Sequence, residues 1–141
     1  MNDNDLRQLL SKLDGAEESE DARSVTKLLR LAVALNEWDY PCVSRIECGF
    51  PVQDAAYVGD IELLLSNAHG IWKVTVRPSE TGSLVTYVDP DGAVDGKREQ
   101  ELKAVFERCG YVYMPPRLLR EGHPRAPYAT WFDRFFVHDY G

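Results

Sequence analysis

The chain has 141 residues, of which 44% are apolar and 28% are charged, a composition typical of a single globular domain spanning residues 1–141. Its 23 acidic and 16 basic residues give a net charge of −7, which disfavours binding to nucleic-acid phosphates and to anionic membrane surfaces. No apolar run approaches the roughly 20 residues that a membrane-spanning helix needs, so we expect no membrane partner.

Two helices are predicted at the start of the chain. Leucines at 6, 9, 10 and 13 recur at helical spacing, and Asn4 or Asp5 is the expected N-cap. A second helix is expected to begin near the acidic stretch 17–21 and to end before Pro41. Its predicted apolar stripe has helical spacing and consists of Ala22, Val25, Leu28, Leu29, Ala32, Val33 and Asn36.

The period then changes from helical to alternating, which indicates strands at 42–50, 60–67, 70–78 and 83–89. In the first of these, Cys42, Ser44 and Ile46 are expected on one face. The connections at 67–70 and 79–82 are short, so the last three strands are predicted to form an antiparallel meander.

A helix is predicted from about Lys97, with Gly110 just beyond its end, followed by a short strand at 111–114. The stretch 116–127 is predicted to be an irregular loop, and Thr130 is the expected N-cap of a final helix with Asp133 at its third position. Helices followed by consecutive strands indicate the α+β class. We expect a mainly antiparallel sheet of about four to five strands, with helices packed on it.

The final helix carries four aromatic residues on one side, namely Trp131, Phe132, Phe135 and Phe136. Four exposed aromatic side chains would form a larger apolar patch than monomers normally tolerate. We therefore expect the sheet of the same chain to cover them, with a second copy or another protein as the alternative cover.

Patterns that would indicate a metal or a calcium ion are incomplete. The loop 89–96 offers Asp89, Asp91 and Asp95, but its glycine falls at the wrong position for an EF-hand, so a turn is expected. The cysteines, Cys42, Cys48 and Cys109, lack ligand spacing and are interpreted as free thiols of a cytoplasmic protein. The N-terminus lacks the pattern of a signal peptide. No cofactor is predicted.

The basic stretch 117–125 allows two interpretations. Arg117, Arg120 and Arg125 either form a surface for an acidic ligand or pair internally with the acids of the sheet. One hypothesis for this region is a small enzyme or ligand-binding domain with a pocket lined by His123, Arg120 and Tyr128.

The C-terminal TWFDRFF at 130–136, which follows a loop rich in proline and arginine, resembles the ends of small bacterial proteins, some of which are immunity proteins of polymorphic toxin systems. The resemblance implies a role as a non-catalytic inhibitor that occludes a toxin.

A negative net charge suits a basic toxin as the partner. The predicted partner-binding residues are acids and aromatic anchors: Asp54, Tyr57, Asp60, Glu62, Trp72, Asp89 and Asp91. A third hypothesis is an oligomeric structural protein, and either a monomer or a homodimer is expected.

Overall fold

The computed structural model describes residues 1–14, 25–47, 59–79, 81–125 and 127–136. The helices are Asp3–Leu13 (α1), Val25–Trp38 (α2), Gly96–Arg108 (α3), Pro116–Leu119 (α4) and Trp131–Phe135 (α5). The strands are Val43–Glu47 (β1), Asp60–Asn67 (β2), Gly70–Pro78 (β3), Leu84–Val88 (β4) and Val112–Tyr113 (β5).

The sheet has five strands in the order β1-β2-β3-β4-β5. Strands β1 to β4 are antiparallel to their neighbours, and the predicted meander of β2, β3 and β4 is confirmed. After β4 the chain crosses through α3 and returns as β5, which pairs with β4 in parallel. The predicted α+β class is confirmed.

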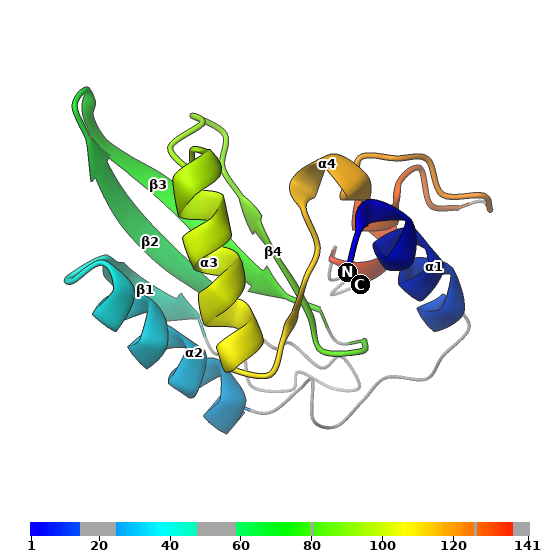
Figure 1. The fold of residues 1–141 in the computed structure, drawn as a ribbon, viewed down its shortest axis with the longest axis horizontal. Coiled ribbons are helices and arrows are strands. Elements are labelled where there is room, and N and C mark those ends of the chain that lie inside the picture. Colours follow the sequence, from blue (N-terminus) through cyan, green and yellow to red (C-terminus); the bar gives the residue numbers. More distant parts are fainter. Residues whose placement is uncertain (15–24, 48–58, 80, 126, 137–141) are drawn as a thin grey trace.

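Helices α2 and α3 lie together on one face of the sheet (Figure 1). Alternate residues of the meander point towards them, so Ile61, Leu63 and Leu65 are fully buried against Val74 and Val76. Period-two burial of this kind follows from the pleat, because successive side chains point to opposite faces of a sheet. The indole of Trp38 also joins α2 to α3 by donating to a Glu101 carboxylate oxygen at 3.0 Å.

The predicted apolar stripe of α2 is wrong at two positions. Leu29 and Val33 are 44% and 60% exposed, whereas the buried face of α2 is formed by Leu28, Leu31, Ala32 and Leu35. Successive residues of an α-helix are only 100° apart around its axis, so the predicted and the observed buried faces of α2 overlap. Only one of these faces can pack against the core. In the structure, the face of α2 centred on Leu31 packs against the sheet.

The first strand departs from the predicted alternation. Its register shifts between Val43 and Arg45, so Val43 pairs with Leu63 and Ile46 pairs with Ile61. A bulge of this kind moves one side chain to the other face, which places Val43 and Ile46 on the same side of the sheet. Cys42 precedes the strand and is buried. The part of the predicted strand beyond Glu47 lies outside the described residues.

The helix caps show how local sequence sets the ends of the outer helices. Helix α1 begins two or three residues earlier than predicted, with Asn2 rather than Asn4 or Asp5 as its N-cap, and Asn2 and Asp5 form a capping box. The predicted capping box of Thr130 and Asp133 at α5 is confirmed. Gly110 follows α3 with a φ of 85°, a value that favours glycine.

The predicted loop at 116–127 contains a helix. Pro116 occupies the first position of α4, where a missing N–H costs nothing, and Leu118 and Leu119 turn inwards and are buried. This helix was missed because four residues are too few for a periodic pattern to be recognised.

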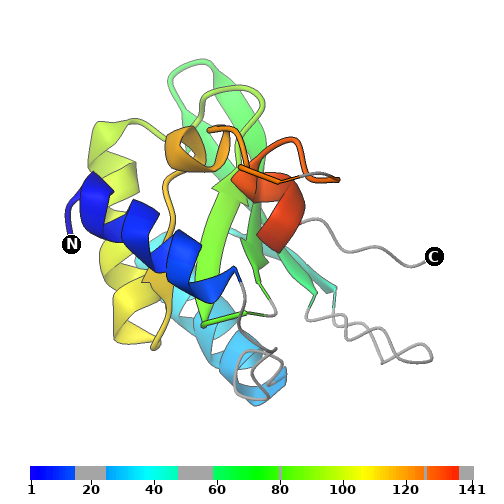
Figure 2. The same ribbon diagram turned by 90° about the vertical axis from the view of Figure 1, so that its right-hand side faces the viewer.

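The terminal aromatic residues join a second core cluster, separate from the one under α2 and α3. Trp131, Phe135 and Phe136 are buried, and Phe132 is partly buried. Their cover comes from α1, α4 and the end of β4, through Leu6, Leu10, Leu84, Met114, Leu118 and Leu119. Figure 2 shows α1 and α5 on either side of β4. The prediction of self-coverage therefore holds for these residues, with helices as well as the sheet as the cover.

We predict that Phe136→Ala lowers the free energy of unfolding by about 3 to 5 kcal/mol, because the side chain is fully buried in the second cluster and its removal leaves a cavity. Urea denaturation followed by circular dichroism measures the change. The control is Ile71→Ala, at a side chain 68% exposed, which we expect to change stability by less than about 0.5 kcal/mol. Equal losses in the two variants would contradict the burial of the C-terminal aromatic residues.

Candidate binding surface

One face of the sheet, here called the outer sheet face, carries exposed apolar side chains. Leu64, Ile71 and Val88 are 43%, 68% and 37% exposed. Leu64 and Ile71 have the opposite parity to the residues of β2 and β3 that are buried against α2 and α3, and Val88 has the opposite parity to Val85 and Tyr87. The cross-strand pairs Leu64 with Lys73, Ser66 with Ile71 and Thr75 with Val88 place all three on one side. Among the described residues, α2 and α3 both pack on the other face.

The charged residues of the outer sheet face are already paired. Asp60 receives two hydrogen bonds from Arg77, each at 3.0 Å, and Glu62 lies 3.5 Å from the Lys73 ammonium. At the edge strand, Arg45 pairs with Glu47 at 2.9 Å. Each of these three pairs is neutral, so the face offers apolar side chains interspersed with ion pairs and no excess of acid.

Asp60 has a structural role through its partner. Arg77 lies over the ring of Phe132, with the guanidinium carbon 5.9 Å from the ring centre, and also donates to the Phe136 carbonyl at 3.4 Å. The Asp60–Arg77 pair therefore joins α5 to β2 and β3. Of the two predicted acids on this face, Glu62 is the more accessible.

The other predicted partner-binding residues are dispersed. Trp72 lies on the face that α2 and α3 cover, is partly buried, and donates from its indole to Asn67 at 3.1 Å. Asp89 and Asp91 lie in the turn between β4 and α3, where Asp91 is exposed. Asp54 and Tyr57 lie outside the described residues. The structure therefore brings Asp60 and Glu62 together and places Trp72, Asp89 and Asp91 elsewhere.

The excess negative charge is concentrated in particular segments of the sequence. The described residues contain 16 acids and 15 bases, so they are nearly neutral. Six of the seven net charges come from residues outside that part, namely Glu17, Glu18, Glu20, Asp21, Asp54, Glu80 and Asp139 set against Arg23. The densest of these groups is the stretch 17–21, between α1 and α2.

A buried carboxylate that sequence reasoning missed holds the two ends of the chain together. Asp14, directly after α1, accepts hydrogen bonds from His123 Nε2 at 3.0 Å, from Arg134 Nε at 3.0 Å and from the Arg125 guanidinium. Arg134 also donates to the Asp14 carbonyl at 2.9 Å. A single acid after a predicted helix has no distinctive spacing, so only its three partners reveal its role.

The electrostatics of this cluster follow from its burial and its donors. Burial alone would raise the pKa of Asp14, but the hydrogen bonds from His123 and Arg125 outweigh that effect, so the pKa lies below its ordinary value. The His123 ring is 1% exposed and makes edge contacts with Tyr128 and Trp131, at centroid distances of 5.3 and 4.6 Å. His123 is therefore enclosed by aromatic rings and a carboxylate, which suits a structural role.

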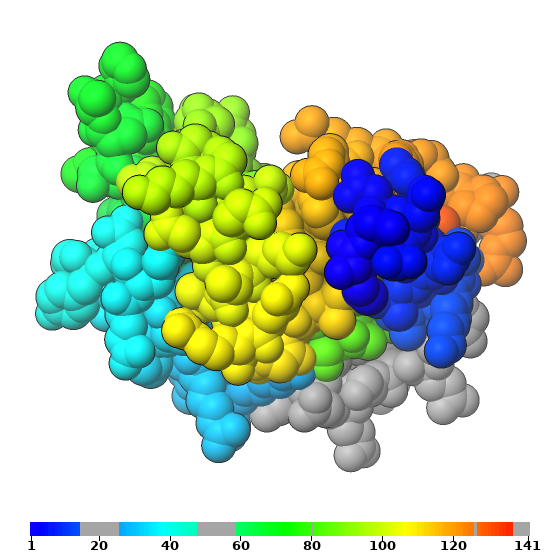
Figure 3. All heavy atoms as spheres, in the orientation of Figure 1, coloured from blue at the N-terminus to red at the C-terminus, as the bar shows by residue number. Residues whose placement is uncertain are grey.

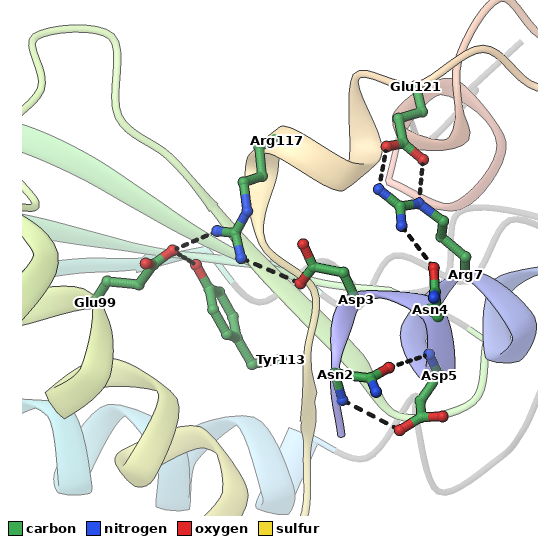
Figure 4. A network of polar contacts seen from close by, with 9 residues as sticks. All are labelled: Asn2, Asp3, Asn4, Asp5, Arg7, Glu99, Tyr113, Arg117 and Glu121. Atoms are coloured by element: carbon green, nitrogen blue, oxygen red, sulfur yellow. Dashed lines mark hydrogen bonds and ion pairs between the residues drawn. The ribbon is translucent and has the colours of Figure 1, made fainter.

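A second polar network joins α1, α3, β5 and α4 (Figure 4). The Tyr113 hydroxyl donates to Glu99 at 2.7 Å, and Arg117 lies between Glu99, at 3.4 Å, and Asp3, at 3.3 Å. Arg7 donates two hydrogen bonds to the Glu121 carboxylate, at 2.9 and 2.8 Å. Burial, followed by Tyr87 and Glu99, raises the pKa of Tyr113, so its phenol stays protonated at neutral pH.

The hypothesis of a pocket formed by His123, Arg120 and Tyr128 stays a prediction. His123 and Tyr128 are in ring contact, but Arg120 lines two hollows beside the turn after β4, and neither His123 nor Tyr128 lines them. Arg117 and Arg125 pair internally, as one of the two interpretations of the basic stretch expected. Arg120 differs: among the described residues no hydrogen bond or ion pair of its guanidinium is found.

Two further findings bear on the kinds of site considered. No group of three or more His, Cys, Asp or Glu residues in the described part of the chain is arranged to hold a metal ion. No helix in that part is both long enough and apolar enough to cross a membrane.

Comparison of the chain with protein-family models, with curated proteins and with solved structures found no match. What can be said of function therefore rests on the geometry of this chain.

We predict that Asp14→Asn lowers the free energy of unfolding by about 2 kcal/mol at pH 7, because the donors of His123, Arg125 and Arg134 lose their charged acceptor. A pKa lowered by folding makes the carboxylate stabilising above the ordinary pKa of about 3.9, and that contribution is lost as the pH falls through the lower folded-state value. The difference from wild type is thus expected to shrink below pH 4.

Urea melts of wild type and variant between pH 7 and pH 2.5 measure this dependence. The matched control is Asp91→Asn, at an exposed turn position, which we expect to leave stability nearly unchanged at every pH. A constant difference for Asp14→Asn across the whole range would show that its carboxylate charge is not what stabilises the fold.

We predict that Cys42 resists alkylation in the folded protein. Burial raises the pKa of the Cys42 thiol to about 11, and its sulfur lies 3.2 Å from the Leu35 carbonyl oxygen, so little reactive thiolate exists at pH 8. Iodoacetamide treatment followed by peptide mass spectrometry is expected to modify Cys42 only after denaturation. Rapid modification of the native protein at Cys42 would contradict this environment.

Proposed function

We propose that this protein is a non-catalytic binding domain that acts by holding another protein against the outer sheet face. The observation that carries the proposal is the exposure of Leu64, Ile71 and Val88 on one side of the meander. Exposed apolar side chains accompanied by polar ones are the usual composition of a protein–protein contact. Here the Glu62–Lys73 pair lies among the three apolar residues, because Lys73 pairs with Leu64 and Glu62 lies opposite Thr75, the partner of Val88. The Arg45–Glu47 pair lies on the edge strand.

Internal use of the ionisable groups supports a non-catalytic role. His123, Arg125 and Arg134 surround Asp14, while Arg117 bridges Glu99 and Asp3. A general base or nucleophile must be able to reach a substrate, and His123, whose ring is 1% exposed and paired with Asp14, is poorly suited to that task. These groups hold α1 against the C-terminal segment instead.

The proposed partner is a basic protein, and the proposed role is that of an immunity or inhibitor protein that occludes a toxin in the cytoplasm. The acidic stretch 17–21 supports this partner, because four acids within five residues attract a basic surface and raise the association rate. The apolar residues of the outer sheet face would then supply most of the affinity, and the acidic stretch most of the dependence on salt.

The test is co-purification from the native source with two single variants that differ only in the face they alter. We predict that Ile71→Asp reduces recovery of a stoichiometric partner at least tenfold, because it places a charge at the most exposed of the three apolar positions. Val33→Asp changes a similarly exposed apolar residue on α2, on the opposite side of the sheet, and is expected to retain the partner.

The role of charge is tested by replacing Glu17, Glu18, Glu20 and Asp21 with their amides, which we expect to slow association and flatten its salt dependence. Retention of the partner by Ile71→Asp together with its loss on Val33→Asp would move the interface to α2. If no stoichiometric protein is captured and the protein alone sediments as a dimer that Ile71→Asp dissociates, the outer sheet face serves self-association.

A further inference from the structure

Two adjoining hollows flank Arg120, where α4 lies beside the turn that joins β4 to α3 (Figure 1). The larger has a volume of about 340 Å³ and the smaller about 270 Å³. They share Tyr87, Asp89, Pro116 and Arg120 as lining residues, so we treat them as one groove, called the Arg120 groove. A notch at the top of the space-filling view in Figure 3 opens between the same two segments.

The walls of the larger hollow are largely apolar and are held in place by the rest of the fold. Tyr87 is stacked on Tyr113, with the ring centres 5.9 Å apart and the planes only 6° from parallel. Leu119 is buried in the second core cluster, and Phe132 packs against the same cluster. A groove of a few hundred Å³ with ordered aromatic walls is of the size and composition that small organic ligands use.

Arg120 is the only basic residue that lines the larger hollow. Its backbone is fixed at the end of α4, where its N–H donates to the Pro116 carbonyl at 3.2 Å. The neighbouring arginines are neutralised: Arg117 by Glu99 and Asp3, and Arg125 by Asp14. Within the described ranges the Arg120 guanidinium has no such acidic partner, so its five N–H donors remain available.

The carboxylates near Arg120 are engaged elsewhere. Asp89 accepts from the backbone N–H groups of Ala93 and Val94, both at 2.8 Å, and so stabilises the turn. Glu99 accepts from the Tyr113 hydroxyl and from Arg117. The groove therefore presents one uncompensated cation beside an apolar cavity, and two acids at its margin oppose any ligand that carries more than one negative charge.

We propose that the Arg120 groove binds a small aromatic monocarboxylate, whose ring occupies the apolar hollow and whose carboxylate accepts hydrogen bonds from Arg120. A guanidinium matches a carboxylate with two parallel N–H donors, and such charge-assisted bonds are about twice as strong as neutral ones. Tyr87 and Phe132 supply ring surfaces for stacking. The site does not require the outer sheet face to bind a protein.

The test is a nuclear magnetic resonance titration of the full chain with phenylacetate, 4-phenylbutyrate and naphthalene-2-acetate, each compared with its primary amide. We expect saturable shifts of the backbone amides of Val88, Leu119, Arg120 and Thr130, and at least tenfold weaker binding of each amide than of its acid. Arg120→Gln and Arg120→Glu are expected to weaken carboxylate binding at least tenfold while leaving binding of the amides within threefold.

The matched control is Arg45→Gln, at an exposed arginine on the edge strand β1, which we expect to bind the carboxylates as wild type does. Retained dispersion of the amide spectrum establishes that each variant is folded. The proposal is overturned if none of the three carboxylates gives saturable shifts at the groove up to 5 mM, if acids and amides bind equally, or if Arg120→Gln leaves the affinity of the carboxylates unchanged.

Discussion

The carboxylate of Asp14 links the two ends of this chain, which are separated by more than a hundred residues in sequence. It follows α1 and accepts hydrogen bonds from His123 and Arg125, which precede α5, and from Arg134 within α5. Desolvating one acid is costly, and several charge-assisted hydrogen bonds are needed to offset that cost. The cluster therefore requires α1 and the C-terminal segment to dock together, and this docking encloses Leu10, Trp131 and Phe136.

The Asp14 cluster and the other ion pairs together determine which basic residues remain available to bind a ligand. Arg125 and Arg134 are used at Asp14, Arg117 at Glu99 and Asp3, and Arg77 at Asp60. These pairs hold α1, α4 and α5 beside the sheet. The described part of the protein is nearly neutral in net charge. Arg120 differs from its neighbours because it has no ion pair among the described residues and lines the Arg120 groove.

The sheet has two unlike faces because helices cover them unequally. Helices α2 and α3 cover one face, whereas α5 reaches the other only near the paired ends of β3 and β4, through Arg77 and Leu84. Leu64 and Ile71 lie beyond that reach. An antiparallel meander tolerates one solvated face, which normally carries polar residues. Apolar residues at three positions of that face are the basis of the proposed protein contact, and one of them, Val88, also lines the Arg120 groove.

Local patterns in the sequence determined the α+β class, the meander, α3 with Gly110 after it, and the capping box of α5, because each depends on residues within a few positions of one another. Once the register of the meander is assumed, the alternation of strand residues also predicts that Leu64, Ile71 and Val88 share one face of the sheet. Tertiary structure alone decided that Leu31 rather than Leu29 faces the core, that β1 contains a bulge, and that Asp14 collects three basic partners. Those outcomes depend on contacts between distant segments, whose geometry no local spacing encodes.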